Sequence, residues 1–96
     1  MTSAPLSLEL KPKLAPKTKL RLDPKSGKYI LLYPEKGLLL NPTGAAILKL
    51  CTGEQTLSAI VAALVVEFQS DTDKVQAEVV AFIQGLLDRG LVQAEP

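Results

Sequence analysis

The sequence predicts an α+β domain in which a three-stranded antiparallel meander is followed by a three-helix bundle. Two observations predict this class: strand-like apolar runs separated by proline and glycine fill residues 18–41, and helical periodicity with capping residues fills 42–92. The chain has 96 residues, of which 47% are hydrophobic, so it is long enough for one modest core. Only 4% are aromatic, so we expect an aliphatic core.

The meander is predicted from three short runs with turn residues between them. Residues 19–23 alternate polar and apolar side chains, which is typical of a half-buried strand. Residues 29–33 are apolar on both faces and are therefore predicted as the central strand, and 38–40 form the third strand. The connections at 23–27 and 34–37 contain the proline and glycine residues that tight turns favour.

The first two helices are marked by capping residues. Asn41 is predicted to cap a helix with Pro42 at its first position, and Gly53 is predicted to end it in a left-handed conformation. A second helix is predicted to begin near Thr56. Its apolar residues form one amphipathic stripe, made of Leu57, Ile60, Val61, Leu64, Val65 and Phe68.

The third helix is predicted from about Lys74 to Arg89, with Gly90 ending it. Its apolar arc is wider than a surface helix needs; it comprises Val75, Val79, Val80, Phe82, Ile83, Leu86 and Leu87. Two interpretations remain open. The whole arc packs against the sheet and the other helices, or the flank at Val75, Val79 and Phe82 lines a groove.

The N-terminal segment has a different composition from the rest of the chain. It contains three prolines without a periodic pattern, and proline removes a backbone donor and favours extended geometry in its predecessor. Basic residues outnumber acidic ones there. The predicted division is a flexible basic arm at 1–17, a single domain at 18–92 and a tail at 93–96.

The histidine and paired cysteine residues that many catalytic and metal sites use are missing from the sequence. It contains no histidine, and its single cysteine, Cys51, is predicted to pack in the core. Neither a GxGxxG nor a GxxxxGKS/T phosphate-binding motif occurs. We therefore expect a binding module and not an enzyme, with no catalytic residues, no metal and no cofactor.

The expected location is the cytoplasm, with no membrane partner. No apolar stretch approaches the ~18 residues that a membrane-spanning helix needs. The N-terminus lacks the continuous hydrophobic segment of a secretory signal. One cysteine excludes an internal disulfide framework, which fits a reducing compartment.

A nucleic-acid-binding protein of the winged-helix type is one alternative, because such proteins combine three helices with a β element. The helix that enters the groove then needs basic residues, since phosphate neutralisation dominates affinity. The predicted third helix instead carries Asp73, Glu78 and Asp88 against Lys74 and Arg89. This charge pattern argues against a nucleic-acid partner, although the basic arm could still contact a phosphate backbone.

The two outer strands of the predicted meander differ in charge. The first carries Lys19, Arg21 and Asp23, which discourage pairing with another chain, whereas Leu38–Leu40 carry no charge. We interpret the third strand as a docking edge for an extended peptide, with the third helix beside it supplying pockets. Two alternatives stay open: the edge is covered by the N-terminal arm, or it pairs with a second copy in a structural homodimer.

The chain resembles a known family in the order and spacing of several segments: Pro12–Pro16, Arg21–Asp23, Leu31–Glu35, Leu40–Asn41, Ala45–Leu48, Leu50–Cys51, Gly53–Glu54, Thr56, Ile60–Val61 and Arg89–Gly90. These segments resemble the PqqD-like family, the peptide chaperones of pyrroloquinoline quinone biosynthesis. The resemblance implies a winged-helix-like recognition element that binds a ribosomally made precursor peptide. It also implies presentation of that peptide to a radical S-adenosylmethionine enzyme.

The resemblance also implies where the peptide binds. Family members bind it beside the third strand and the third helix, which coincides with the uncharged edge. Carried onto this chain, the expected peptide-binding residues are Leu38, Leu39, Leu40, Asn41, Val75, Glu78, Val79 and Phe82.

Overall fold

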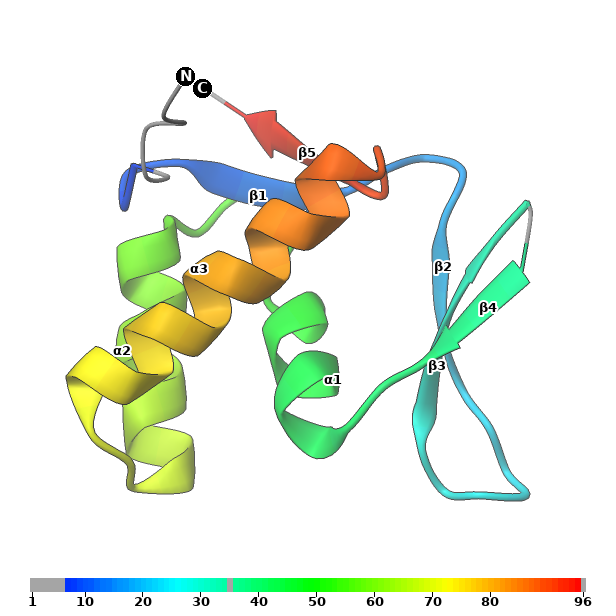
Figure 1. Ribbon diagram of the computed structural model, residues 1–96, viewed down its shortest axis with the longest axis horizontal. Helices are drawn as coiled ribbons and strands as arrows, with labels where there is room; N and C mark the ends of the chain where they lie inside the picture. Colours follow the sequence, from blue (N-terminus) through cyan, green and yellow to red (C-terminus); the bar gives the residue numbers. More distant parts are fainter. Residues whose placement is uncertain (1–6, 35, 96) are drawn as a thin grey trace.

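The computed structural model describes residues 7–34 and 36–95. In chain order the elements are β1 (Lys11–Leu14), β2 (Lys19–Leu22), β3 (Tyr29–Tyr33), β4 (Lys36–Leu39), α1 (Pro42–Lys49), α2 (Leu57–Phe68), α3 (Thr72–Asp88) and β5 (Val92–Glu95). Strands β2, β3 and β4 form an antiparallel sheet in that order, and β1 pairs with β5 in a separate two-stranded sheet. In Figure 1, α1 lies between the meander and α2, and the β1–β5 ribbon crosses one end of the helices.

The meander has one face toward the helices and one face away from them. Leu31 on the central strand is 0% exposed and pairs with Leu20 on β2 and Leu38 on β4. These three side chains join or pack against the core. Their strand neighbours Ile30 and Leu39 are also paired with each other, but on the opposite face because side chains alternate along a strand. The predicted meander is therefore present, with β3 central as expected, although the third strand is Lys36–Leu39 and not 38–40, because the pairing with β3 extends back to Tyr33↔Lys36.

Each helix begins at a capping side chain, as the sequence predicts for the first two. Asn41 Oδ1 accepts a hydrogen bond of 2.7 Å from the Gly44 amide, and Thr56 Oγ1 accepts one of 3.1 Å from the Ala59 amide. Asp71 caps α3, which therefore starts two residues before the predicted Lys74. A capping side chain satisfies a backbone donor that the first helical turn leaves unpaired.

The predicted end of α1 at Gly53 is wrong, because the helix ends at Lys49. The backbone beyond it pairs with β1 instead. The Leu14 amide donates to the Cys51 carbonyl at 3.2 Å, and the Gly53 amide donates to the Pro12 carbonyl at 2.9 Å. Gly53 does take a positive φ of 86°, but within this connection and not at the helix end.

The predicted end of α3 is confirmed. Gly90 has a φ of 71°, in the left-handed region that glycine adopts without strain. Its amide donates to the Leu87 carbonyl at 3.0 Å, and the next amide, of Leu91, donates to the Leu86 carbonyl at 2.9 Å. This bond pair is the Schellman motif, which satisfies the last helical carbonyls and turns the chain into β5.

The assignment of residues 7–17 to a flexible arm, and of 93–95 to a tail, is wrong. Each segment contributes to a strand, and β1 and β5 pair in the register Lys11↔Glu95 to Leu14↔Val92. The Ala15 amide donates to the Leu91 carbonyl and therefore faces β5. Because successive residues of an antiparallel strand face opposite sides, Lys13 and Lys11 also face β5, and the nitrogen of Pro12 faces away from it. Proline's missing donor therefore costs this ribbon nothing. Residues 1–6 and 96 lie outside the described residues.

Cys51 lies in the core directly after α1 and is 3% exposed. Its Sγ lies 3.3 Å from the Ile47 carbonyl oxygen, which accepts its weak hydrogen bond. Burial removes the thiolate from water and raises the pKa of the Cys51 thiol to about 12.

The native protein is expected not to react with a thiol reagent such as iodoacetamide at pH 8. The thiolate is the reactive species, and at pH 8 the thiol stays protonated because its pKa is about 12. Mass spectrometry of aliquots from native buffer and from 8 M urea checks this, since unfolding restores an ordinary pKa. Stoichiometric labelling of the folded protein on the time scale of the urea control would contradict it.

Candidate functional site

The outer edge of β4 offers unpaired backbone groups. β4 is an end strand of the meander, and no strand in the described part of the chain pairs with its outer side. The Leu40 amide donates to the Tyr29 carbonyl at 2.9 Å. Since antiparallel residues alternate between facing one neighbour and the other, the backbone groups of Leu39 and Gly37 point toward the open edge. The Leu39 side chain is 55% exposed.

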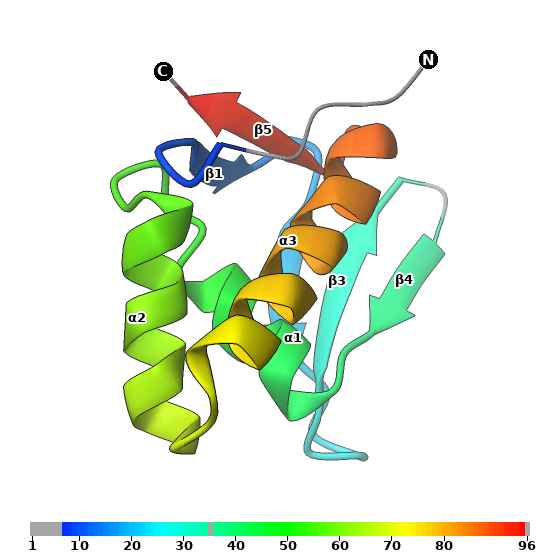
Figure 2. The same cartoon turned by 60° about the vertical axis from the view of Figure 1, so that its left-hand side comes forward.

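A groove lies where β4 passes into α1, between the start of that helix and the middle of α3. We call it the α1–α3 groove; its volume is about 530 Å³, and it is lined by Asn41, Thr43, Gly44, Ile47, Glu78, Ala81 and Phe82. Figure 2 shows α3 passing beside α1 and the β4–α1 connection. Its walls combine aliphatic and aromatic side chains with an amide, a hydroxyl and one carboxylate, a mixture that suits a peptide with both polar and apolar groups.

Gly44 allows α3 to approach α1 at this groove. A Cβ atom at this position would lie 3.3 Å from the Phe82 ring and 3.1 Å from Asn41 Oδ1. The absence of a side chain therefore lets the ring rest on the first turn of α1 while Asn41 still caps it. Sequence reasoning missed Gly44, although a glycine in the first turn of an apolar helix is a signal of close approach.

The structure brings together some of the expected binding residues and separates others. Asn41, Glu78 and Phe82 line the α1–α3 groove, and Leu39 is exposed on the β4 edge. Leu38 is half-buried against the core. The other three are core residues with 6% exposure or less: Leu40, Val75 and Val79. A peptide role for all eight stays a prediction.

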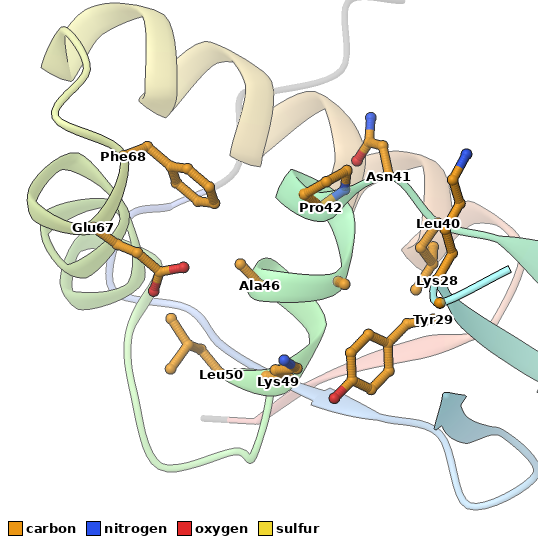
Figure 3. Close-up of a pocket in the computed structure, with 12 residues that line it drawn as sticks. Lys28, Tyr29, Leu40, Asn41, Pro42, Ala46, Lys49, Leu50, Glu67 and Phe68 are labelled. Atoms are coloured by element: carbon orange, nitrogen blue, oxygen red, sulfur yellow. The ribbon is translucent and has the colours of Figure 1, made fainter. Parts of the chain in front are cut away.

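Sequence reasoning also missed a second cavity, shown in Figure 3, which is lined by the flank of α1 opposite to the α1–α3 groove. We call it the hairpin pocket; its volume is about 400 Å³, and it is lined by Gly27, Lys28, Tyr29, Leu40, Asn41, Pro42, Ala45, Ala46, Lys49, Leu50, Glu67 and Phe68. The ammonium of Lys49 lies 4.2 Å from the centre of the Tyr29 ring, a cation–π contact. No single segment predicts this pocket, since the β2–β3 turn, α1 and the end of α2 each supply one wall.

Two further properties bear on what the molecule can do. Within residues 7–34 and 36–95, no group of three or more His, Cys, Asp or Glu side chains is placed to hold a metal ion. In the same ranges, each helix is too short or too polar to cross a membrane.

Comparison with known proteins decides the family. Residues 22–92 match the family model described as coenzyme PQQ synthesis protein D (PqqD). The chain belongs to the PqqD family. The resemblance stated from the sequence is thus confirmed, and the match covers the meander from the end of β2, all three helices and the start of β5.

Several known proteins align over most of this chain. A PqqA binding protein of Rhodopseudomonas palustris (strain HaA2) is 31% identical over 87 residues, covering 91% of this chain and 85% of the relative. One from Methylococcus capsulatus is 32% identical over 80 residues, covering 83% and 84%. The bifunctional coenzyme PQQ synthesis protein C/D of Methylorubrum extorquens is 29% identical over 82 residues, which are 22% of its length.

The fold is also shared with a solved member of the PqqD family. The solution structure of the PqqD truncation of Methylobacterium extorquens PqqCD superimposes with a TM-score of 0.75 at 29% identity, covering 85% of this chain and 87% of that one. That protein is described as a stand-alone recognition element for ribosomally synthesised, post-translationally modified peptides. The predicted α+β, winged-helix-like class is confirmed by this likeness.

Proposed function

We propose that this chain binds a PqqA precursor peptide as an added strand on the open edge of β4 and presents it to a radical S-adenosylmethionine enzyme. The chain acts as a cytoplasmic, non-catalytic chaperone in pyrroloquinoline quinone synthesis. Relatives that align over most of its length are PqqA binding proteins, which supports the client. The observation that carries the binding mode is the unpaired edge of β4 beside the α1–α3 groove, where residues 37–39 carry no charge.

Strand addition uses backbone hydrogen bonds for affinity and neighbouring pockets for selectivity. The backbone donors and acceptors of Gly37 and Leu39 supply the hydrogen bonds, and the α1–α3 groove supplies the pocket that selects side chains. The opposite edge of the meander is protected. β2 there carries exposed Lys19 and Arg21, whose charges disfavour pairing with another strand. β4 carries a single charge, Lys36 at its first position, and its remaining residues leave the edge open to a docking peptide.

A non-catalytic role is supported by the chemistry of the side chains at the site. The chain has no histidine, and its only thiol is buried with its pKa raised to about 12. The α1–α3 groove adds an amide, a hydroxyl and the carboxylate of Glu78, which is exposed to solvent. These groups suit hydrogen bonding to a peptide, and the reaction itself is left to the partner enzyme.

The test is a titration of the ¹⁵N-labelled protein with synthetic PqqA peptide of Rhodopseudomonas palustris. We expect the largest shifts at the amides of Gly37 and Leu39 and along Glu78–Phe82. Ala81→Leu, which fills the α1–α3 groove, is expected to raise Kd by about fivefold or more. Ala77→Leu is the matched control, since Ala77 is exposed one turn earlier on α3 and lines none of the described cavities. Equal affinities for the two variants, or shifts confined to other surfaces, would overturn the binding mode.

A homodimer remains a second candidate because the same edge of leucines can pair with a second copy. Peptide and second copy then compete for the Leu39 backbone. Sedimentation velocity over a hundredfold range of protein concentration, with and without peptide, distinguishes the two. If the protein forms a dimer and the peptide dissociates it, the two copies pair through this edge. If the protein stays monomeric at every concentration, the homodimer is excluded.

A further inference from the structure

The hairpin pocket is shaped to hold a flat apolar side chain. Figure 3 shows the rings of Tyr29 and Phe68 on opposite sides of Ala46. Small residues, Ala45 and Ala46, leave the space between the rings open, and the volume of about 400 Å³ is at the lower end of the range for ligand pockets. The Tyr29 and Phe68 rings, with two alanines between them, favour an aromatic side chain in the pocket, because aromatic rings pack in offset or edge-to-face pairs.

The charges around the hairpin pocket are arranged by sign. Lys49 stands at the end formed by the sheet, near Tyr29, whereas Glu67 stands at the end formed by α2, beside Phe68 (Figure 3). The side chain of Lys28 extends away from Tyr29. The contact of Lys49 with the Tyr29 ring keeps one ammonium at the sheet end. An acidic group is therefore favoured at the sheet end and disfavoured at the α2 end.

The hairpin pocket is continuous with the edge where the peptide is proposed to bind. Asn41 lines both this pocket and the α1–α3 groove, and Leu40, which directly follows β4, also lines the pocket. A peptide paired with β4 that runs past Leu39 thus reaches Asn41 at the start of α1. From there the α1–α3 groove opens on one flank of the helix and the hairpin pocket on the other.

We infer that the hairpin pocket is a second subsite for the client peptide, which takes an aromatic side chain between Tyr29 and Phe68 and a neighbouring carboxylate at Lys49. This inference rests on the proposed function and adds a sequence requirement to it: an aromatic residue next to an acidic one, beyond the segment paired with β4. Selection by this subsite adds specificity that backbone pairing alone does not supply.

The experiment measures PqqA peptide affinity for Ala46→Leu, which fills the pocket. We expect a Kd at least about fivefold above that of the wild type. Ala63→Leu is the matched control, because Ala63 is exposed on α2 and lines none of the described cavities. Peptides with each aromatic residue replaced by alanine are then titrated against both proteins. We expect one of these alanine replacements to weaken binding to the wild-type protein but not binding to Ala46→Leu. This non-additivity identifies the aromatic residue that occupies the pocket.

A parallel cycle tests the charge requirement with Lys49→Ala and peptides in which each acidic residue is replaced by its amide. The Ala45 and Ala46 methyl shifts of the wild-type protein at peptide saturation provide a readout that needs no variant. If wild type binds with an unchanged Ala46 methyl shift, or if Ala46→Leu binds as tightly as wild type, the second subsite is overturned and the proposed function stands. If the wild type does not bind the peptide, the proposed function itself fails.

Discussion

Replacing Leu39 with proline is expected to weaken PqqA peptide binding by about five- to tenfold while the fold stays intact. The Leu39 amide points to the open edge of β4, since the Leu40 amide donates to β3. Proline removes only that donor and leaves the peptide carbonyl opposite without its partner, a loss of ~1–1.5 kcal/mol. Proline is tolerated on an edge strand when its nitrogen faces away from the neighbouring strand.

Leu39→Ala is the matched control, because it shortens the same side chain and keeps the amide. We expect it to lose less affinity than Leu39→Pro, and we expect both to unfold near the wild-type urea midpoint, since Leu39 is 55% exposed. Isothermal titration calorimetry measures the affinities and circular dichroism the midpoints. Wild-type affinity for a folded Leu39→Pro would exclude pairing through this amide.

Local signals predicted most of the meander and the helices. The prolines and glycines of the turns, Asn41 and Thr56 at helix starts and Gly90 at a helix end act through bonds within a few residues, so one segment carries the information. The β1–β5 ribbon is different in kind. It joins residues 11–14 to 92–95, and nothing in the composition of either short segment identifies the other.

The candidate site was predictable in part for a similar reason. The absence of charge from Leu38 to Leu40 pointed to this edge, but only alternation along the strand shows that Leu39 faces outward while Leu40 enters the core. On α3, Val75 and Val79 lie one turn apart and continue to Ile83, all buried. The groove residues Glu78 and Phe82 follow a neighbouring row. The hairpin pocket could not be predicted from the sequence, because its walls come from the β2–β3 turn, α1 and α2, which approach one another only in the folded structure.

Removing residues 1–15 is expected to lower the free energy of unfolding by ~3 kcal/mol or more, a large part of what a domain of this size has. The deletion takes away Pro12 and Ala15, both buried, and the half-buried Leu14. It also removes the carbonyl of Leu10, which accepts a bond of 2.9 Å from the amide of Leu57 at the start of α2. A flexible arm, as composition alone suggests, would predict no loss.

A chain starting at residue 7 is the matched control, because it keeps every one of these contacts. Urea unfolding followed by circular dichroism compares the two truncations with the full chain. Since the deletion leaves Cys51 and Gly53 without their backbone partners on β1, native-state thiol labelling of Cys51 should rise in the shorter chain even where helical signal survives. Equal urea midpoints and equal labelling rates for the two truncations would show that the meander and helices fold without β1.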